Sequence, residues 1–261
     1  MKKFIISIDQ GTTSSRAILF DLKGKPVFSS QKEFTQYFPN SGWVEHNPEE
    51  IWSTTKKVLK DVIQKAKRIK GKILTIGITN QRETTVLWNK KTGKPIYNAI
   101  VWQDRRQEEY CKKLRKQNKE TLIFNRTGLL IDSYFSGMKI KWILDNVPKA
   151  KALMNKKQLL FGTIDSFLIW RFTKGKVHAT DATNASRTMI YNITSNKWDD
   201  KILNLLKIKK HILPEVKDCA ADYGSTHSSI TGKSISISGV VGDQQSATIG
   251  QCCFEPGSLK S

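Results

Sequence analysis

The order of the apolar runs is the feature that most constrains the fold of this chain. Residues 4–9 and 16–21 are two apolar runs joined by a short polar link, which is the pattern of a β-hairpin. A third strand is expected at 26–34 and a capped amphipathic helix at 48–67. The next run, KILTIGITN, indicates a strand covered on both faces. Three strands, a helix and further strands predict an α/β fold built on a mixed sheet.

Further elements are expected along the rest of the chain, with a more helical and less regular middle at 108–235. Thr84–Trp88 is expected to form another strand. Helices are expected within three stretches: 108–120, 136–146 and 162–172. The tail, ISISGVVGDQQSATIGQCC, predicts a strand, a glycine turn and a helix.

The composition is that of a globular chain with a core. Hydrophobic residues make up 38% and aromatic residues 9% of 261 residues. No apolar run is long enough to cross a membrane, and Asp9 interrupts the start, MKKFIISIDQ, so no signal peptide is expected. The four cysteines show no metal-binding spacing and are expected to be reduced thiols. A cytoplasmic location without membrane insertion is therefore expected.

The net charge of +21 admits two interpretations. A strongly basic chain can bind nucleic acid. The excess, however, is mostly lysine in scattered pairs, and no recognition helix or RNA-binding motif accompanies it. Solvated surface lysines, with no specific nucleic-acid partner, are the preferred interpretation.

The polar link between the first two strands, IDQGTTSSR, has the composition of a phosphate-binding turn. Gly11 allows close backbone approach, and a run of hydroxyl residues and an arginine supplies donors: Thr12, Thr13, Ser14 and Arg16. Asp9 lies where a carboxylate could hold Mg²⁺ through water. The spacing is not that of a Walker loop. An ordinary hairpin turn remains an alternative.

Two later loops follow apolar strands in the same way. In NQRET, Arg82 and Glu83 could contact polyol hydroxyls by donating and accepting, or could form a surface ion pair. In GVVGDQQSA, Asp243 stands at a helix start, where it could accept a substrate proton, share a metal or simply cap the helix. Trp102 and Tyr134 could face a small polyol or belong to the core.

Seven motifs in this order resemble the glycerol kinases of the FGGY carbohydrate kinase family: IDQGTTSSRA, SGWVEHNPEEIW, IGITNQRETT, GKPIYNAIVWQ, YFSGMKIKWILD, TDATNASRTM and ISGVVGDQQSA. The resemblance runs from about Lys3 to Gly257. It implies an actin-like, ribonuclease H-like domain over 1–257, with a mixed sheet and helices on both faces. It also implies ATP- and Mg²⁺-dependent phosphorylation of glycerol to sn-glycerol 3-phosphate.

The resemblance also implies roles for single residues. Asp243 matches the catalytic base, and Asp9 and Asp243 match the carboxylates near Mg²⁺. The residues that match ATP phosphate contacts are Thr12, Thr13, Ser14 and Arg16. Those that match glycerol contacts are Arg82, Glu83, Trp102, Tyr134, Asp243 and Gln244.

The sequence departs from the family in three places. Ser133 stands where the family usually has proline, which predicts a less rigid loop before Tyr134. The stretch HSSITGKSISISG lacks the glycine- and arginine-rich loop of many bacterial relatives, which puts their inhibition by fructose bisphosphate in doubt here. The family also has a C-terminal adenosine-binding domain that these 261 residues do not contain.

Without that C-terminal domain, the sequence admits more than one form of the protein. A truncated or split kinase with a separate C-terminal partner is expected, and a homo-oligomer is compatible with the resemblance. An inactive polyol-binding remnant is the alternative function.

Overall fold

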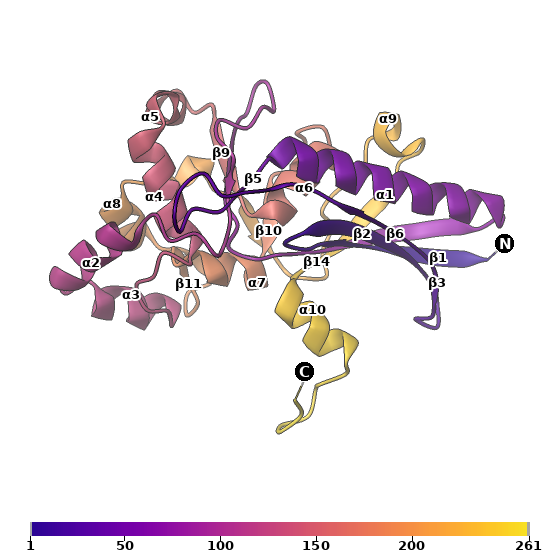
Figure 1. The fold of residues 1–261 in the computed structure, drawn as a ribbon. Coiled ribbons are helices and arrows are strands. Elements are labelled where there is room, and N and C mark those ends of the chain that lie inside the picture. Colours follow the sequence, from indigo (N-terminus) through magenta and orange to yellow (C-terminus); the bar gives the residue numbers. More distant parts are fainter. Residues whose placement is uncertain (1, 260–261) are drawn as a thin grey trace.

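The computed structural model describes residues 2–259, and its centre is a five-stranded mixed sheet (Figure 1). The strands lie in the order β14–β6–β1–β2–β3. Their bounds are β1 Lys3–Gln10, β2 Ser14–Asp21, β3 Pro26–Glu33, β6 Lys72–Asn80 and β14 Ser236–Gly242. The first three strands are antiparallel neighbours, whereas β6 pairs in parallel with both β1 and β14. The predicted hairpin, third strand and mixed sheet are confirmed.

Helix α1 (Pro48–Arg68) covers one face of this sheet (Figure 1). The Asn47 side chain accepts a hydrogen bond from the Glu49 amide at 2.9 Å, as expected of a helix cap. Val58 and Val62 on α1 are fully buried in the same core cluster as Ile6 and Ile8 of β1. Alternate residues of a strand point to opposite faces, so the even-numbered residues of β1 form the covered side.

Helix α10 (Asp243–Gly250) lies on the other face, at one end of the sheet (Figure 1). The hydroxyls of Thr79 on β6 and Ser246 on α10 are 3.0 Å apart and share a hydrogen bond. The rest of this face is only partly covered, since Ile5 is 37% exposed. Helices therefore contact both faces, as the fold class requires, but unequally.

A second body of structure, built on helices, adjoins the sheet and has its own hydrophobic cluster. Its helices are α2 Glu108–Lys116, α3 Glu120–Thr127, α4 Ser136–Asn146, α5 Pro148–Asn155 and α8 Asp200–Leu206. Strands β7 Val86–Asn89 and β9 Leu159–Gly162 pair antiparallel at the boundary. Val86 and Trp88 belong to the hydrophobic cluster of the sheet, and Leu87 belongs to the second cluster. Strand β7 therefore contributes side chains to both clusters.

Short elements complete the chain. The helices are α6 Ile164–Phe172, α7 Ala182–Ala185, α9 Ser228–Thr231, η1 Ser186–Thr188 and η2 Lys210–Ile212. The strands are β4 Gln36–Tyr37, β5 Glu45–His46, β8 Ala99–Ile100, β10 Ala179–Asp181, β11 Tyr191–Asn192, β12 Lys197–Trp198 and β13 Glu215–Lys217. Within residues 2–259, no helix is both long and apolar enough to cross a bilayer.

Three element boundaries differ from the sequence predictions. The helix expected at 108–120 ends at Lys116, because Asn118 adopts a left-handed backbone with φ of 54° before α3 begins. The strand expected from Thr84 begins only at Val86, after Glu83 at φ 61°. Gly162 ends β9 rather than starting α6, and a Cβ there would lie 2.5 Å from the Ser166 Cβ.

The carboxyl ends of three parallel strands meet at one edge of the sheet. Asn80 at the end of β6 pairs with Gln10 of β1 on one side and with Gly242 of β14 on the other. The loops that follow these three residues are therefore neighbours, although they lie far apart in the sequence. Ligands of open α/β sheets bind at such an edge.

Candidate functional site

The turn after β1 presents unpaired donors. The Gly11 amide donates to the Ser14 carbonyl at 2.9 Å, which closes a tight turn. Within the described residues, the main-chain amides of Thr12 and Thr13 donate no hydrogen bond. Thr13 is exposed, and the Ser14 hydroxyl accepts from Gln31 at 2.9 Å. Free amides on a tight turn can bind an anion such as phosphate.

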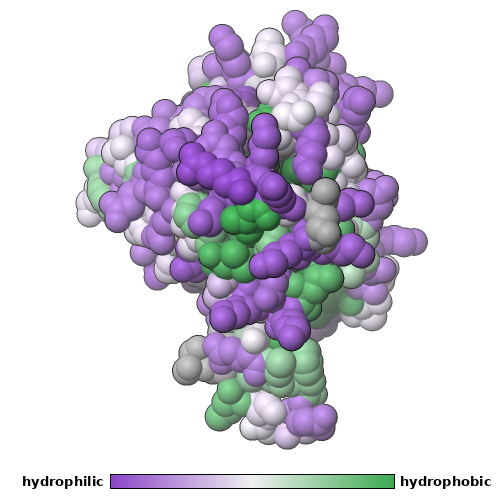
Figure 2. Space-filling view, turned by 90° about the vertical axis from the view of Figure 1, so that its right-hand side faces the viewer, coloured by the Kyte–Doolittle hydropathy of each residue, from purple (hydrophilic) through white to green (hydrophobic). Residues whose placement is uncertain are grey.

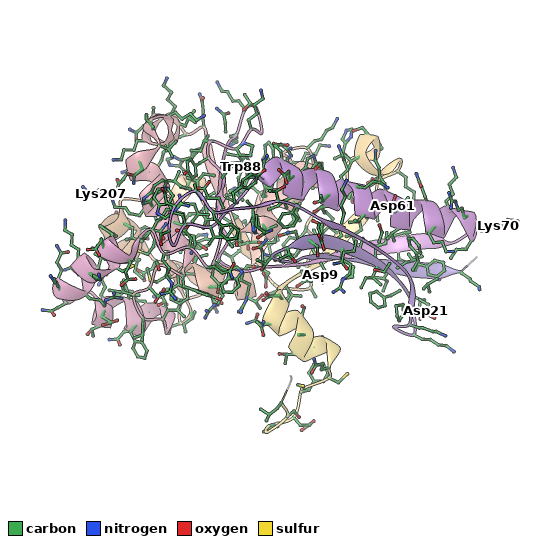
Figure 3. The ribbon with its side chains drawn as sticks, viewed as in Figure 1. Asp9, Asp21, Asp61, Lys70, Trp88 and Lys207 are labelled. Atoms are coloured by element: carbon green, nitrogen blue, oxygen red, sulfur yellow. The ribbon has the colours of Figure 1, made fainter. Side chains whose placement is uncertain are left out.

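Asp9 and Arg16 pair across the hairpin. An Arg16 nitrogen lies 2.5 Å from an Asp9 carboxylate oxygen, and both side chains are partly exposed. Asp9 lies at the end of the sheet near α10, whereas Asp21 and Lys70 lie at the opposite end (Figure 3). Both predicted residues of this pair therefore lie on the loop edge, in contact with each other.

Arg82 and Asp243 form the contact between the second and third loops. The Arg82 Nε donates to Asp243 Oδ1 at 2.9 Å, and the Gln244 amide donates to the same oxygen at 2.6 Å. The other oxygen, Oδ2, makes no hydrogen bond within the described residues. The N-cap residue of α10 is Gly242, so the alternative that Asp243 merely caps this helix is wrong. One oxygen is fixed and the other is available.

Glu83 is buried and pairs across 104 residues. It is 2% exposed, and its Oε1 accepts from the Arg187 Nε at 2.6 Å. Burial raises the pKa of the Glu83 carboxyl, while Arg187, Arg82 and Lys139 oppose that rise. A surface pair of Arg82 with Glu83 is therefore excluded. The left-handed backbone of Glu83 is a strained conformation of the kind that clusters at functional sites.

Trp102 and Tyr134 face each other beside the first turn. The Trp102 indole Nε1 donates to the Thr12 hydroxyl at 3.0 Å, and its ring centroid lies 5.6 Å from that of Tyr134. The Arg187 guanidinium lies 5.8 Å from the Tyr134 ring centroid. Both aromatic side chains are only half-buried, and the Tyr134 hydroxyl has no hydrogen bond within the described residues. They are not ordinary core residues.

Sequence reasoning assigned no role to three residues that hold this edge together. The Gln81 side chain donates to the Gly11 carbonyl at 3.0 Å and joins the loops after β1 and β6. The His46 ring lies 3.4 Å from Gln81, and burial lowers the pKa of His46 to about 4. Arg187 pairs with Glu83. All three residues lie inside motifs quoted above, His46 in SGWVEHNPEEIW, Gln81 in IGITNQRETT and Arg187 in TDATNASRTM, and that position was the signal in the sequence.

The donor set at this edge fits a hydrated Mg²⁺ better than a metal held by protein alone. In residues 2–259, no group of three or more His, Cys, Asp or Glu side chains could hold a metal. Asp9 and Asp243 offer one partly exposed carboxylate each. Mg²⁺ in phosphoryl-transfer sites commonly takes one or two carboxylates, several waters and substrate phosphates. In number and type, Asp9 and Asp243 could supply the carboxylates of such a site.

Two of the larger grooves lie away from these residues. One, of about 590 Å³, lies beside the start of α1 and residues 94–98. Another, of about 560 Å³, lies between the end of α1 and residues 231–233, at the opposite end of the sheet.

The mixed sheet with polar loops at its carboxyl edge defines an actin-like ATPase domain of the kind found in sugar kinases. The chain belongs to the FGGY family of carbohydrate kinases, whose N-terminal domain matches residues 4–250.

The most informative relatives are glycerol kinases. The chain is 59% identical to the glycerol kinase of Sinorhizobium fredii and 57% identical to that of Rhizobium meliloti, over the whole chain and 52% of each relative. It therefore spans about half the length of the curated relatives it matches.

Solved structures agree with this family. A crystal structure of Plasmodium falciparum glycerol kinase with ADP matches with a TM-score of 0.93 at 37% identity, over 97% of this chain and 51% of that one. A gluconate kinase from Lactobacillus acidophilus matches with a TM-score of 0.86 at 25% identity, over 96% of this chain and 50% of that one.

Proposed function

We propose that this chain is the polyol-binding domain, over residues 1–257, of a kinase that phosphorylates glycerol with ATP. The arrangement around Asp243 carries the proposal, because one carboxylate oxygen is held by Arg82 and the Gln244 amide while the other is free. The similarity to glycerol kinases supports glycerol over larger sugars. The adenosine-binding residues would come from a second domain, since the chain spans about half of its relatives.

In this mechanism Asp243 acts as the general base. A terminal hydroxyl of glycerol donates to Oδ2, and its proton moves there as the hydroxyl oxygen forms a bond to the γ-phosphorus. The bond between that phosphorus and the leaving oxygen of ADP breaks in the same displacement. The hydrogen bond from the Arg82 Nε to Oδ1 fixes the direction of the Asp243 carboxylate.

The other polar groups orient the substrate. Glu83 accepts from a glycerol hydroxyl while Arg187 holds its Oε1, and the Tyr134 hydroxyl makes a further hydrogen bond. Trp102 faces the carbon chain. The amides of Thr12 and Thr13, the Ser14 hydroxyl and Arg16 would contact phosphate oxygens. ATP supplies the phosphoryl group, and Mg²⁺ near Asp9 and Asp243 would neutralise charge on it.

A chimera tests this function. Residues 1–261 are joined to the C-terminal half of the Sinorhizobium fredii glycerol kinase, and ATP-dependent phosphorylation of glycerol is followed in a coupled assay. We expect turnover from the chimera and none from residues 1–261 alone, which should still bind radiolabelled glycerol in equilibrium dialysis. A chain that fails to bind glycerol would reject the proposed substrate.

The alternative is a polyol-binding domain without catalytic ability. It predicts glycerol binding by residues 1–261 and no turnover by a chimera that is folded and binds both glycerol and ATP. Robust turnover by residues 1–261 alone would contradict both versions, because the second domain would then be dispensable.

A further inference from the structure

Lys139 is a lysine in an environment where lysine is rare. It lies on α4, one turn after the loop that carries Tyr134, and its side chain is fully buried. Lysine is almost never fully buried in proteins unless it is paired. Its neighbours on α4, Met138 and Ile140, are apolar and equally buried. An apolar side chain would therefore suit the core at this position.

The ammonium group of Lys139 contacts the main chain of the Tyr134 loop. Its Nζ donates to the Ser133 carbonyl at 2.8 Å and to the Tyr134 carbonyl. Asp132 adds a contact within the same loop, because its Oδ1 accepts from the Tyr134 amide at 2.8 Å. Two consecutive carbonyls and one amide around Tyr134 are thus fixed by two side chains.

No carboxylate within 4.0 Å pairs with Lys139 among the described residues. Burial lowers the pKa of Lys139 to about 7, opposed at longer range by Glu83, Asp104, Asp132 and Cys111. A buried cation without a direct partner is costly to the folded state. A contact that the fold retains at such a cost is best explained by what it holds in place.

Ser133 leaves the Tyr134 loop more dependent on the Lys139 contact. It is fully buried, and its backbone lacks the rigidity that a proline would give. The Ser136 hydroxyl, at the start of α4, donates to the Glu83 carbonyl at 2.9 Å. Helix α4 is therefore tied to Glu83 through Ser136 and to the Tyr134 loop through Lys139.

We propose that Lys139 is a positioning residue, which holds the loop 132–135 so that the Tyr134 hydroxyl reaches a polyol bound at Glu83. This inference rests on the proposed function for its substrate, but the placement of the loop can be measured without any substrate.

Selective labelling observes the contact directly. Carbonyl-13C tyrosine and 15N phenylalanine together give a signal only from Tyr-Phe pairs, which occur at Tyr37–Phe38 and Tyr134–Phe135. The Tyr134→Phe variant assigns the signals. In residues 1–261, Lys139→Met should move the Tyr134 carbonyl signal and leave the Tyr37 signal in place. Lys141→Met is the matched control on the same helix, because Lys141 pairs with Asp145, and it should move neither.

A double-mutant cycle then connects the loop to binding. By equilibrium dialysis with radiolabelled glycerol, Lys139→Met should weaken affinity about two- to ten-fold, which is roughly the effect of one hydrogen bond. In the Tyr134→Phe background the same change should have an effect of less than about two-fold, because the hydroxyl that it positions is gone. A general loss of structure would weaken binding equally in both backgrounds.

Two outcomes would overturn the inference: an unmoved Tyr134 carbonyl signal in Lys139→Met, or equal losses of affinity in the two backgrounds. If Lys139→Met does not fold, Lys139→Leu replaces it, since leucine also lacks a donor for the two carbonyls. If the wild-type chain binds no glycerol, the proposed substrate fails, and the carbonyl signal still decides the role of Lys139.

Discussion

At the scale of single residues, the functional groups of the loop edge are held by partners from other segments of the chain. Asp243 is fixed through one oxygen by Arg82, Glu83 by Arg187, and the Tyr134 main chain by Lys139. Such partners limit the positions that a reacting group can adopt, which is how preorganised sites lower activation barriers. In each pair, we expect one residue to contact the substrate and the other to hold that residue in place.

The first residue-scale prediction separates catalysis from binding in the chimera. Asp243→Asn keeps the size and a hydrogen-bonding tip but cannot accept the proton, so kcat should fall by about 10²-fold or more with little change in glycerol KM. Tyr134→Phe should instead raise KM by the equivalent of one hydrogen bond, about 0.5–1.5 kcal/mol. Steady-state kinetics at saturating ATP and Mg²⁺ measure both. An intact kcat in Asp243→Asn would make Asp243 a binding residue only.

The second concerns pH and Lys139. Its pKa is about 7 in the folded chain and 10.5 in an ordinary environment, so between these values the unfolded chain holds a proton that the folded chain has released. The free energy of unfolding should therefore gain a contribution that rises with pH above 7, by at most about 1.4 kcal/mol per pH unit. Urea unfolding at pH 7, 8 and 9 should show this rise in the wild type and Lys141→Met but not in Lys139→Met. The same dependence of the free energy of unfolding on pH in Lys139→Met and the wild type would contradict this prediction.

At the scale of elements, the short helix α7 holds the junction between β14 and α10. Asp181 caps α7, and its carboxylate accepts from the Thr183 hydroxyl at 2.5 Å. The Thr183 hydroxyl in turn accepts from the Gly242 amide at 2.8 Å. A segment 59 residues before Gly242 thus fixes the residue immediately before Asp243.

Thr183→Val tests this junction. It preserves the shape but leaves the buried Gly242 amide without an acceptor, which costs about 1–3 kcal/mol. We expect a lower urea midpoint and faster hydrogen exchange of the Gly242 amide. Thr248→Val is the control, because Thr248 is a half-buried residue of α10 whose hydroxyl donates to the Gln244 carbonyl of the same helix. Equal effects of the two variants would show that α7 does not hold the junction between β14 and α10.

At the scale of the whole molecule, two hydrophobic clusters share the strand β7. Trp88, labelled in Figure 3, is fully buried in the sheet's cluster. Its neighbour Leu87 is fully buried in the helical cluster. Hydrophilic side chains cover most of the surface at the outer end of the sheet, around small hydrophobic patches (Figure 2). The lysine excess is consistent with that solvated surface.

The shared strand predicts that residues 1–257 unfold as one domain. Calorimetry should show a single unfolding transition. The free energy of unfolding should fall by about 3–5 kcal/mol in Trp88→Ala and by about 2–5 kcal/mol in Leu87→Ala. Exposed Leu130→Ala should change it little, since Leu130 is 61% exposed. Two transitions, each sensitive to only one core variant, would divide the chain into two domains.

Local patterns in the sequence determined the five strands of the central sheet, α1 and the family of this protein. Alternation and caps act between near neighbours, so 4–9, 16–21 and 48–67 could be predicted directly, and so could the three loops at strand ends. The boundaries near Asn118 and Glu83 could not be predicted, because left-handed backbone at these residues depends on packing.

Only the tertiary structure decided which partners hold the site. Glu83 and Arg187 lie 104 residues apart, and Trp102 and Thr12 lie 90 apart, so no local pattern joins them. Lys139 and Lys141 stand two positions apart in MKIKW, yet one is fully buried against the Tyr134 loop and the other pairs with Asp145 near the surface. Burial of a charged side chain depends on what packs over it, and that is a property of the folded chain alone.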